Sequence, residues 1–168
     1  ERALCACHSL TAITFPDKIE IIKKDMCECC FKLQQVTFPT NLKAIEDYAF
    51  YCTDLIDINL PEGVKTIGER AFSSHSLQHI HLPDSIEELG KAFLVDCHNL
   101  KEITIPRKIT VLKELSFEHD IKLECVTLPN SLKSIEKNAF KDCSSLKNIK
   151  IPEGCKVHNK AFFRTQVK

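Results

Sequence analysis

Apolar residues recur at fixed places in a unit of 22 or 23 residues, and polar residues fill most positions between them. Each unit closes with a leucine, an isoleucine or valine three residues later, and a large apolar residue two residues beyond that. The best-formed copy has Leu146, Ile149 and Ile151 at these places. The two-residue spacing is that of a short β-strand with one face turned inward. We therefore expect one short strand per unit, and seven such strands in one parallel sheet.

The only prolines of the chain follow these predicted strands, and proline cannot donate a hydrogen bond to a strand ladder. Successive prolines are 23, 22, 22, 23, 23 and 23 residues apart. A unit this short has too little apolar surface to close a core alone, so the copies must stack as a solenoid. The prolines are Pro16, Pro39, Pro61, Pro83, Pro106, Pro129 and Pro152.

The other half of each unit begins with a second apolar pair, such as Leu132 and Ile135, which must also face the core. This segment is either a second short strand or a tight turn. An Ala-Phe pair then supplies a phenylalanine ladder on the side opposite the first strand, where we expect a short helical turn. The two shorter units lose one residue between phenylalanine and cysteine, which places the length variation in that turn. The ladder comprises Phe50, Phe72, Phe93, Phe117, Phe140 and Phe162.

The repeated spacing L-x-x-I-x-[IL]-P followed by I-x-x-x-A-F-x-x-C resembles the BspA-type leucine-rich repeats of many bacterial and protist surface proteins. The resemblance covers nearly the whole chain. It implies a right-handed, curved leucine-rich repeat solenoid with a concave parallel β-sheet and short turns or helical turns on the convex side. It also implies adhesion or protein recognition on a secreted or cell-surface protein. Some copies depart from the pattern, for example where Met26 and Cys27 replace Ala-Phe, and these departures loosen packing locally.

Composition agrees with one soluble repeat array over residues 1–168, which we expect to be monomeric. Lysine plus arginine equals aspartate plus glutamate at 23 each, with no basic block, so nucleic acid is not an expected partner. No apolar run approaches the ~20 residues that cross a bilayer. Both ends fall inside a repeat, so we expect a piece of a longer array with residues 164–168 as a frayed tail. Alternatively, Glu1 and Arg2 or the tail after Phe163 form improvised caps.

Five of the ten cysteines share one repeat position, where stacking places them about one strand spacing, ~4.8 Å, apart. Parallel side chains keep the Cβ atoms farther apart than a disulfide prefers, so we expect small buried thiols. The cluster around Cys27, Cys29 and Cys30 lacks the paired loops of structural zinc sites, and no metal or cofactor is expected. The cysteine count leaves the redox compartment open. The five are Cys7, Cys30, Cys52, Cys97 and Cys143.

Residues between the inward strand positions face solvent on the concave sheet, and the repeat alignment turns them into rows. Asp57 and Glu102 should flank His79 in one row, with His81 beside it. This cluster is either a pH-responsive contact patch, an adventitious metal site, or an ordinary solvated face. We expect it to be the centre of a partner-binding surface. The predicted contact residues are Thr37, Asp57, Asn59, His79, His81, Glu102 and Thr104.

Catalysis is not expected from this sequence. Cys125 is separated from His79 and His81 by an intervening strand, and this distance of ~10 Å is outside hydrogen-bond reach. No phosphate-binding loop, G-x-S-x-G or H-E-x-x-H motif occurs, and the four glycines are expected in turns. The leading hypothesis is a protein-binding or adhesion module whose concave face contacts a host or cell-surface protein. The alternative is a structural spacer or intracellular scaffold segment that binds nothing.

Overall fold

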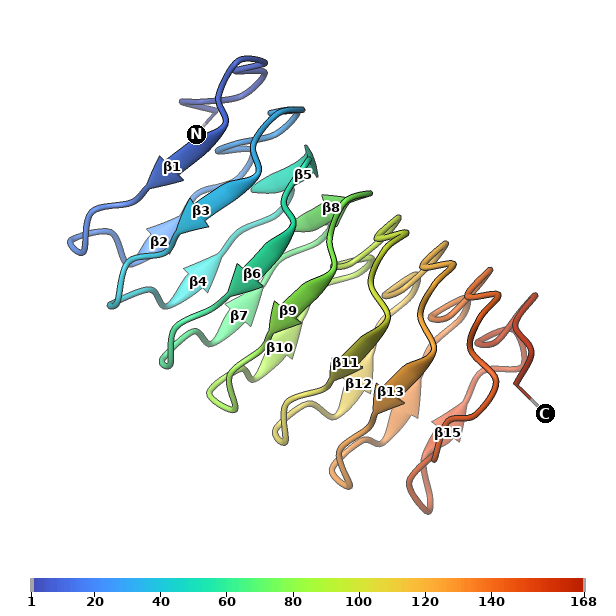
Figure 1. Ribbon diagram of the computed structural model, residues 1–168. Helices are drawn as coiled ribbons and strands as arrows, with labels where there is room; N and C mark the ends of the chain where they lie inside the picture. The colour runs from blue at the N-terminus through green and yellow to red at the C-terminus, as the bar shows by residue number, and fades with distance from the viewer. Residues whose placement is uncertain (1, 168) are drawn as a thin grey trace.

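The computed structural model describes residues 2–167 and shows a leucine-rich repeat solenoid of about seven turns, as the repeat predicted (Figure 1). Six successive coils contribute one short strand each to the surface that we call the first-strand face. Neighbouring strands pair in parallel with the register of the repeat, for example Ile58 with Ile80 and Ile103 with Val126. The strands of this face are β1 (Ala12–Thr14), β3 (Gln35–Thr37), β6 (Asp57–Asn59), β9 (His79–His81), β11 (Glu102–Thr104) and β13 (Cys125–Thr127).

The leucine column runs through the interior as predicted. Leu55, Leu100 and Leu146 have no exposed surface, whereas Leu10 in the first coil is partly buried and packs against the core. Burying a leucine side chain contributes roughly 1.5–3 kcal/mol. Because every coil contributes one such residue, stacking is the main source of stability.

The predicted single sheet on the first-strand face is wrong. This face consists of three two-stranded ladders, β1 with β3, β6 with β9, and β11 with β13, and residues 149–151 form no strand. The two 22-residue units, Pro39 to Leu60 and Pro61 to Leu82, end with β6 and β9, which pair with each other. Both breaks fall where a 22-residue unit meets a 23-residue unit. At these two junctions the one-residue difference in path length shifts one coil against the next, whereas the missing strand at residues 149–151 follows a unit of equal length.

The second apolar segment of each unit is a short strand, which settles the alternative between strand and turn. These strands form a second-strand face with a four-stranded sheet in the order β10-β7-β4-β2 and a three-stranded sheet in the order β12-β14-β15. The most continuous sheet therefore lies on this face. Its strands are β2 (Ile21–Ile22), β4 (Ala44–Ile45), β7 (Thr66–Ile67), β10 (Glu88–Leu89), β12 (Val111–Leu112), β14 (Ser134–Ile135) and β15 (Lys156–Val157).

The third side of the coils, which we call the turn edge, corresponds to residues 137–145 of the best-formed unit. It contains turns, with no helix among residues 2–167, so the expected helical turn is wrong. The physical reason is a pair of left-handed residues four positions apart, such as Asn138 (φ 58°) and Asp142 (φ 60°), which a right-handed helix does not accommodate. In the two shorter units this side forms strands β5 (Phe50–Thr53) and β8 (Phe72–Ser74).

The phenylalanine ladder is confirmed except at Phe93. The rings of Phe117 and Phe140 stack at 5.1 Å, and those of Phe50 and Phe72 at 5.5 Å. Backbone hydrogen bonds from Phe72 to the Phe93 carbonyl and from Leu94 to the next coil place Leu94 at the ladder position. Phe93 occupies the alanine position because its Ala-Phe pair comes one residue early in that unit, and it contacts Phe117 edge-on at 5.3 Å.

The predicted cysteine column is correct for three residues and wrong for Cys52. Cys30, Cys97 and Cys143 are fully buried, as expected of thiols that fill small apolar positions. Cys52 instead lies level with Cys29, whose amide donates to the Tyr51 carbonyl at 2.8 Å, and both cysteines have positive φ. Because the shorter unit has lost one residue, Cys52 occupies the position of Cys29 and not that of the buried cysteine Cys30. Burial raises the pKa of Cys27 to about 12.

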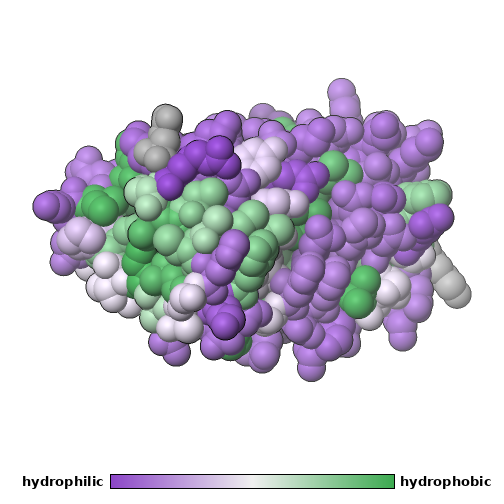
Figure 2. Space-filling view, turned by 90° about the horizontal axis from the view of Figure 1, so that it is seen from above, coloured by the Kyte–Doolittle hydropathy of each residue, from purple (hydrophilic) through white to green (hydrophobic). Residues whose placement is uncertain are grey.

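The surface of the turn edge changes from apolar to polar along the solenoid. Figure 2, which looks onto the molecule from above, shows apolar residues gathered over the N-terminal coils, whereas the C-terminal coils are mostly polar. Phe31 is 54% exposed there and its ring stacks on His8 at 5.1 Å. In the C-terminal coils His119 lies between Asp96 (3.0 Å) and Asp142 (3.3 Å).

Two glycines serve close packing of coils, contrary to the expectation that all four lie in turns. A Cβ at Gly90 would lie 2.3 Å from the carbonyl carbon of Gly68, and one at Gly68 would lie 2.5 Å from the Asp47 amide nitrogen. Only a residue without a side chain fits there. Gly63 (φ 103°) and Gly154 (φ 75°) do occupy turns that require positive φ.

Two predictions concern the chain termini: improvised caps and a frayed tail over residues 164–168. Glu1, part of one proposed cap, and Lys168, the last residue of the predicted frayed tail, lie outside the described residues. The Gln166 amide donates to the Leu146 carbonyl at 3.1 Å, and Val167 packs against the core. Fraying of residues 164–168 stays a prediction, because these contacts describe position and not motion.

Candidate functional site

The strands of the first-strand face position every predicted contact residue towards solvent. Side chains alternate along a strand, so turning the central isoleucine of β6, β9 or β11 inward exposes the residues on either side of it; Ile58 and Ile103 are buried and Ile80 is half-buried. Thr37, on β3, is exposed in the same way. The residues exposed on the other strands are Asp57 and Asn59 on β6, His79 and His81 on β9, and Glu102 and Thr104 on β11.

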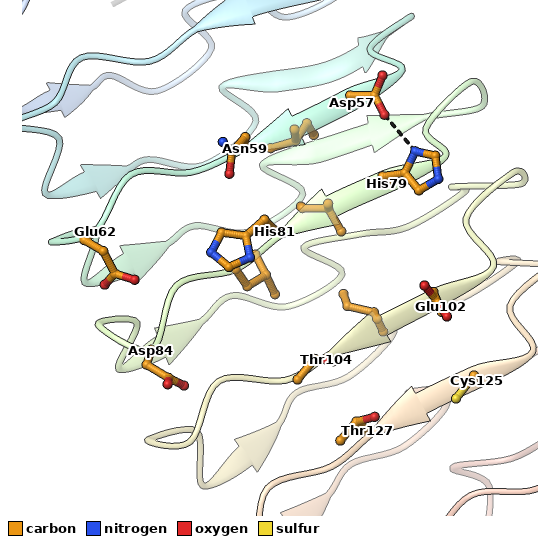
Figure 3. Close-up of a pocket in the computed structure, with 14 residues that line it drawn as sticks. Asp57, Asn59, Glu62, His79, His81, Asp84, Glu102, Thr104, Cys125 and Thr127 are labelled. Atoms are coloured by element: carbon orange, nitrogen blue, oxygen red, sulfur yellow. Dashed lines mark hydrogen bonds and ion pairs between the residues drawn. The ribbon is translucent and has the colours of Figure 1, made fainter.

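Six of the seven residues line a depression of about 690 Å³ that crosses β6, β9, β11 and β13, which we call the groove (Figure 3). Its floor is apolar and comprises Ile58, Ile80, Leu82 and Ile103. Thr37 is not part of the lining, which begins at β6. The groove lies over the second break, between β9 and β11, where no backbone hydrogen bond joins residues 78–82 to residues 101–105.

Four polar residues of the lining lie outside the predicted contact set, although Cys125 and Thr127 belong to the predicted outward rows of the sheet. Glu62 and Asp84 each directly follow a proline, and Cys125 and Thr127 belong to β13. The residue after each proline forms its own column in the repeat alignment, so that column was the available signal. Figure 3 shows Glu62 and Asp84 together at the end of the groove opposite Asp57 and Glu102.

The predicted cluster of imidazoles and carboxylates forms only in part. His79 Nδ1 lies 2.8 Å from Asp57 Oδ1, and both side chains are more than two-thirds exposed (73% and 68%). Glu102, which was expected to flank His79 on the other side, makes no hydrogen bond or ion pair through its carboxylate within residues 2–167. One carboxylate of the cluster is therefore matched and the other is open to solvent.

The far end of the groove is partly neutralised. Arg107 donates to Asp84 through Nε at 2.7 Å and through a second guanidinium nitrogen. These side-chain hydrogen bonds, followed by one from the Arg107 amide, hold the pKa of Asp84 below its ordinary value. Glu62 is exposed and forms no ion pair within the described part of the chain.

The groove is acidic. Its lining includes the carboxylates of Asp57, Glu62, Asp84 and Glu102, and no lysine or arginine. An adjoining depression of about 520 Å³ shares Glu102 with the groove and adds Lys101 and Lys122 together with Glu124. The charges of this second depression therefore balance, in contrast to those of the groove.

The groove holds no assembled nucleophile. Cys125 is the exposed thiol on β13, and β11 with Glu102 lies between it and His79 (Figure 3). Within residues 2–167 no group of three or more histidine, cysteine, aspartate or glutamate side chains is arranged to hold a metal ion. No helix long and apolar enough to cross a membrane occurs in the same residues.

A family model shares the repeat pattern. The model described as "BspA type Leucine rich repeat region (6 copies)" matches residues 1–98 and again residues 76–168. The two matches together span the whole chain. A search of the curated proteins found no match.

Solved structures of bacterial leucine-rich repeat proteins match this solenoid. A protein from Bacteroides ovatus is 31% identical over 89% of this chain, with a TM-score of 0.72. One from T. pallidum is 29% identical over 88%, with a TM-score of 0.81, and one from Eubacterium ventriosum is 25% identical over 94%, with a TM-score of 0.86. The chain spans 45%, 70% and 44% of these three proteins, respectively.

Proposed function

Because the chain belongs to the BspA-type leucine-rich repeat family, we propose that it is a protein-binding module whose first-strand face contacts the partner around β6, β9 and β11. Leucine-rich repeat proteins are generally protein-interaction modules. The observation that carries the choice of face is the groove, which combines an apolar floor with exposed polar side chains. An apolar centre with a polar, solvent-accessible rim is the usual layout of a protein interface.

The proposed contact surface relies on hydrogen bonds and a rigid backbone. Asn59, His81 and Thr104 present donors and acceptors along the groove, and Thr37 would extend the surface onto β3. The strands of this face expose no phenylalanine or tyrosine, the residues that often anchor interfaces. We therefore expect modest affinity per coil, and an extended partner that spans several coils.

We further propose that the module acts in adhesion on a secreted or cell-surface protein, as a monomer and without catalytic activity. The location is supported by the family resemblance. Its test is antibody labelling of intact cells, which should succeed without permeabilisation. Light scattering of the purified chain tests the monomer, and a dimer mass contradicts it.

Partner capture with matched variants tests the binding face. Asn59→Arg combined with Thr104→Arg adds two bulky cations to the groove, whereas Thr110→Arg adds one to an exposed position before β12. A partner captured by the wild-type chain is identified by mass spectrometry, purified, and titrated against each variant. We expect at least about a tenfold loss of affinity for the double variant, since it blocks the groove centre, and no loss for Thr110→Arg.

Two outcomes contradict this proposal. Equal loss for both variants, or none for either, moves the contact away from the first-strand face. If no protein is retained by the wild-type chain, the spacer interpretation takes its place.

A further inference from the structure

We infer that the groove takes an extended protein segment carrying two lysine or arginine side chains, one at each end of the groove. This inference rests on the proposed function and names the chemistry of the partner at the same site. Three properties of the groove support it: its unpaired negative charge, its apolar floor and its length.

Unmatched negative charge is the first observation. Glu62 and Glu102 line the groove without an ion pair in residues 2–167, and Asp57 contacts only the imidazole of His79. No lysine or arginine of the chain belongs to the lining. A partner that brings cations supplies the missing counter-charge, whereas an acidic partner or a nucleic acid is repelled.

The apolar floor selects the type of cation. Ile80, Leu82 and Ile103 line the same groove as the carboxylates of both ends. Lysine and arginine have long apolar stems that lie along such a surface while the charged group reaches a polar rim. A small inorganic cation has no apolar part to pack on this floor, so a lysine or arginine side chain fits the groove better than an inorganic ion does.

The spacing of the two acidic ends sets the spacing of the cations. Asp57 and Glu102 lie at the strand starts, and Glu62 and Asp84 lie beyond the prolines, as Figure 3 shows. Asp57 and Glu62 are five positions apart in the chain. At a rise of ~3.3 Å per residue the ends are roughly 16 Å apart, so an extended partner needs cations about four or five residues apart.

The neighbouring depression limits the direction of the segment. Lys101 and Lys122 lie beyond Glu102, and Lys122 Nζ donates to Asn99 at 2.7 Å. Glu102 and Glu124 balance these lysines, so the depression offers a cationic segment no net attraction beyond Glu102. The segment therefore follows the seam between β9 and β11 towards Glu62 and ends near Glu102.

Three synthetic peptides test the inference by titration of the full-length chain, followed in two-dimensional 1H–15N NMR spectra. Each is a capped serine and threonine nonapeptide: one has lysines at positions 3 and 7, one has glutamates there, and one has lysines at positions 4 and 5. We expect the first to bind in the groove and shift the amides of Ile80 and Ile103. Binding by the adjacent-lysine peptide should be about threefold weaker, because its cations reach only one end.

Matched variants separate the groove from the rest of the surface. Glu62→Gln combined with Glu102→Gln should lower the association constant of the first peptide about tenfold, at roughly threefold per exposed pair. Glu87→Gln on the second-strand face removes a carboxylate that already pairs with two lysines, and should leave the constant unchanged.

The inference is overturned by any of three results: equal binding of the glutamate peptide, amide shifts outside the groove, or no shift with any peptide at about 1 mM. The proposed function has its own readout in the Asn59→Arg and Thr104→Arg capture experiment. A captured partner whose contact segment lacks lysine and arginine contradicts the inference alone.

Discussion

The two strand faces of the solenoid handle charge differently, although the same coils build both. On the second-strand face and its flanks, cations and carboxylates of adjacent coils pair, as in Lys23 with Glu46 at 3.0 Å and Lys65 with Glu87 at 2.8 Å. Among the strand residues of the first-strand face that the structure describes, the one ion pair is His79 with Asp57. The face whose charges are satisfied within the chain suits a structural role, and the other is available to a partner.

The backbone shows the same contrast. The second-strand face is continuous through four strands from β2 to β10, whereas the first-strand face breaks into pairs. Both breaks lie where units of different length meet, and the groove occupies one of them. At the first of these breaks the second-strand face stays bonded between β4 and β7, whereas that face has its own break between β10 and β12, where both units have 23 residues.

The largest effect should come from Gly90→Ala, which breaks the continuity of the second-strand face. The new Cβ would lie 2.3 Å from the carbonyl carbon of Gly68, and neither backbone has room to move. We expect a loss of at least about 3 kcal/mol in the free energy of unfolding, measured by urea denaturation. Gly154→Ala is the control: it meets no atom within 4 Å, and its positive φ costs only about 1 kcal/mol.

Asp120→Cys should produce the next largest effect, in the interior between the two faces. Asp120 is fully buried at a cysteine position, accepts the Cys97 amide at 2.8 Å, and leaves Oδ2 without a partner. Desolvation raises the pKa of its carboxyl well above the ordinary value. The cysteine removes this orphan acceptor and the carboxyl that must stay protonated in the folded chain, but it also leaves the buried Cys97 amide without its acceptor, which costs about 1–3 kcal/mol. We therefore expect a net gain of no more than about 2 kcal/mol at neutral pH.

The sign of the pH dependence follows from that raised pKa. Below the ordinary pKa of aspartate, Asp120 is protonated in both the folded and the unfolded chain. Above it the unfolded chain releases the proton and the folded chain does not, so stability falls as pH rises. The advantage of Asp120→Cys should therefore grow between pH 4 and pH 8 in chemical denaturation. Replacing exposed Glu153 with glutamine should give no such trend, and a flat difference for Asp120→Cys contradicts the account.

The double variant His79→Ala and His81→Ala tests whether the first-strand face serves binding more than stability. Both side chains are exposed on β9, so the free energy of unfolding should stay within about 0.5 kcal/mol. Affinity for a partner bound in the groove should fall about tenfold, because two contact side chains are lost. Calorimetry with the purified partner measures this, and unchanged affinity moves the contact to the loops.

Glu87→Gln should have the smallest effect. Hydrogen bonds from Lys108 and Lys65 lower the pKa of Glu87 to about 2, but the carboxylate is fully exposed and its pairs are screened by salt. A pKa that is lowered in the folded chain stabilises the protein at pH values above the ordinary pKa of glutamate. This stabilisation disappears as the pH falls towards 2. The variant should show a slightly weaker loss of stability between pH 5 and pH 2 at low salt. High salt should abolish the difference.

Much of the candidate site could be predicted from the repeat alone. Strand periodicity placed Asp57, His79 and Glu102 in one outward row, since a buried isoleucine fixes which neighbours face solvent. Glu62 and Asp84 were missed because the pattern ends at the proline and does not say how the following loop folds towards the sheet. The slip that puts Leu94 in the phenylalanine ladder depends on hydrogen bonds between coils, which the alignment of Ala-Phe pairs does not contain.

The amino-acid sequence by itself determined the stacking of coils and the inward or outward side of each strand residue, because these depend on local periodicity and on burying apolar surface. Only the tertiary structure decided where the first-strand face divides, which carboxylates remain unpaired, and that Cys52 lies beside Cys29. Those features arise from the fit of one coil on the next. That fit depends on path lengths and hydrogen-bond geometry across neighbouring coils, and no single repeat specifies them.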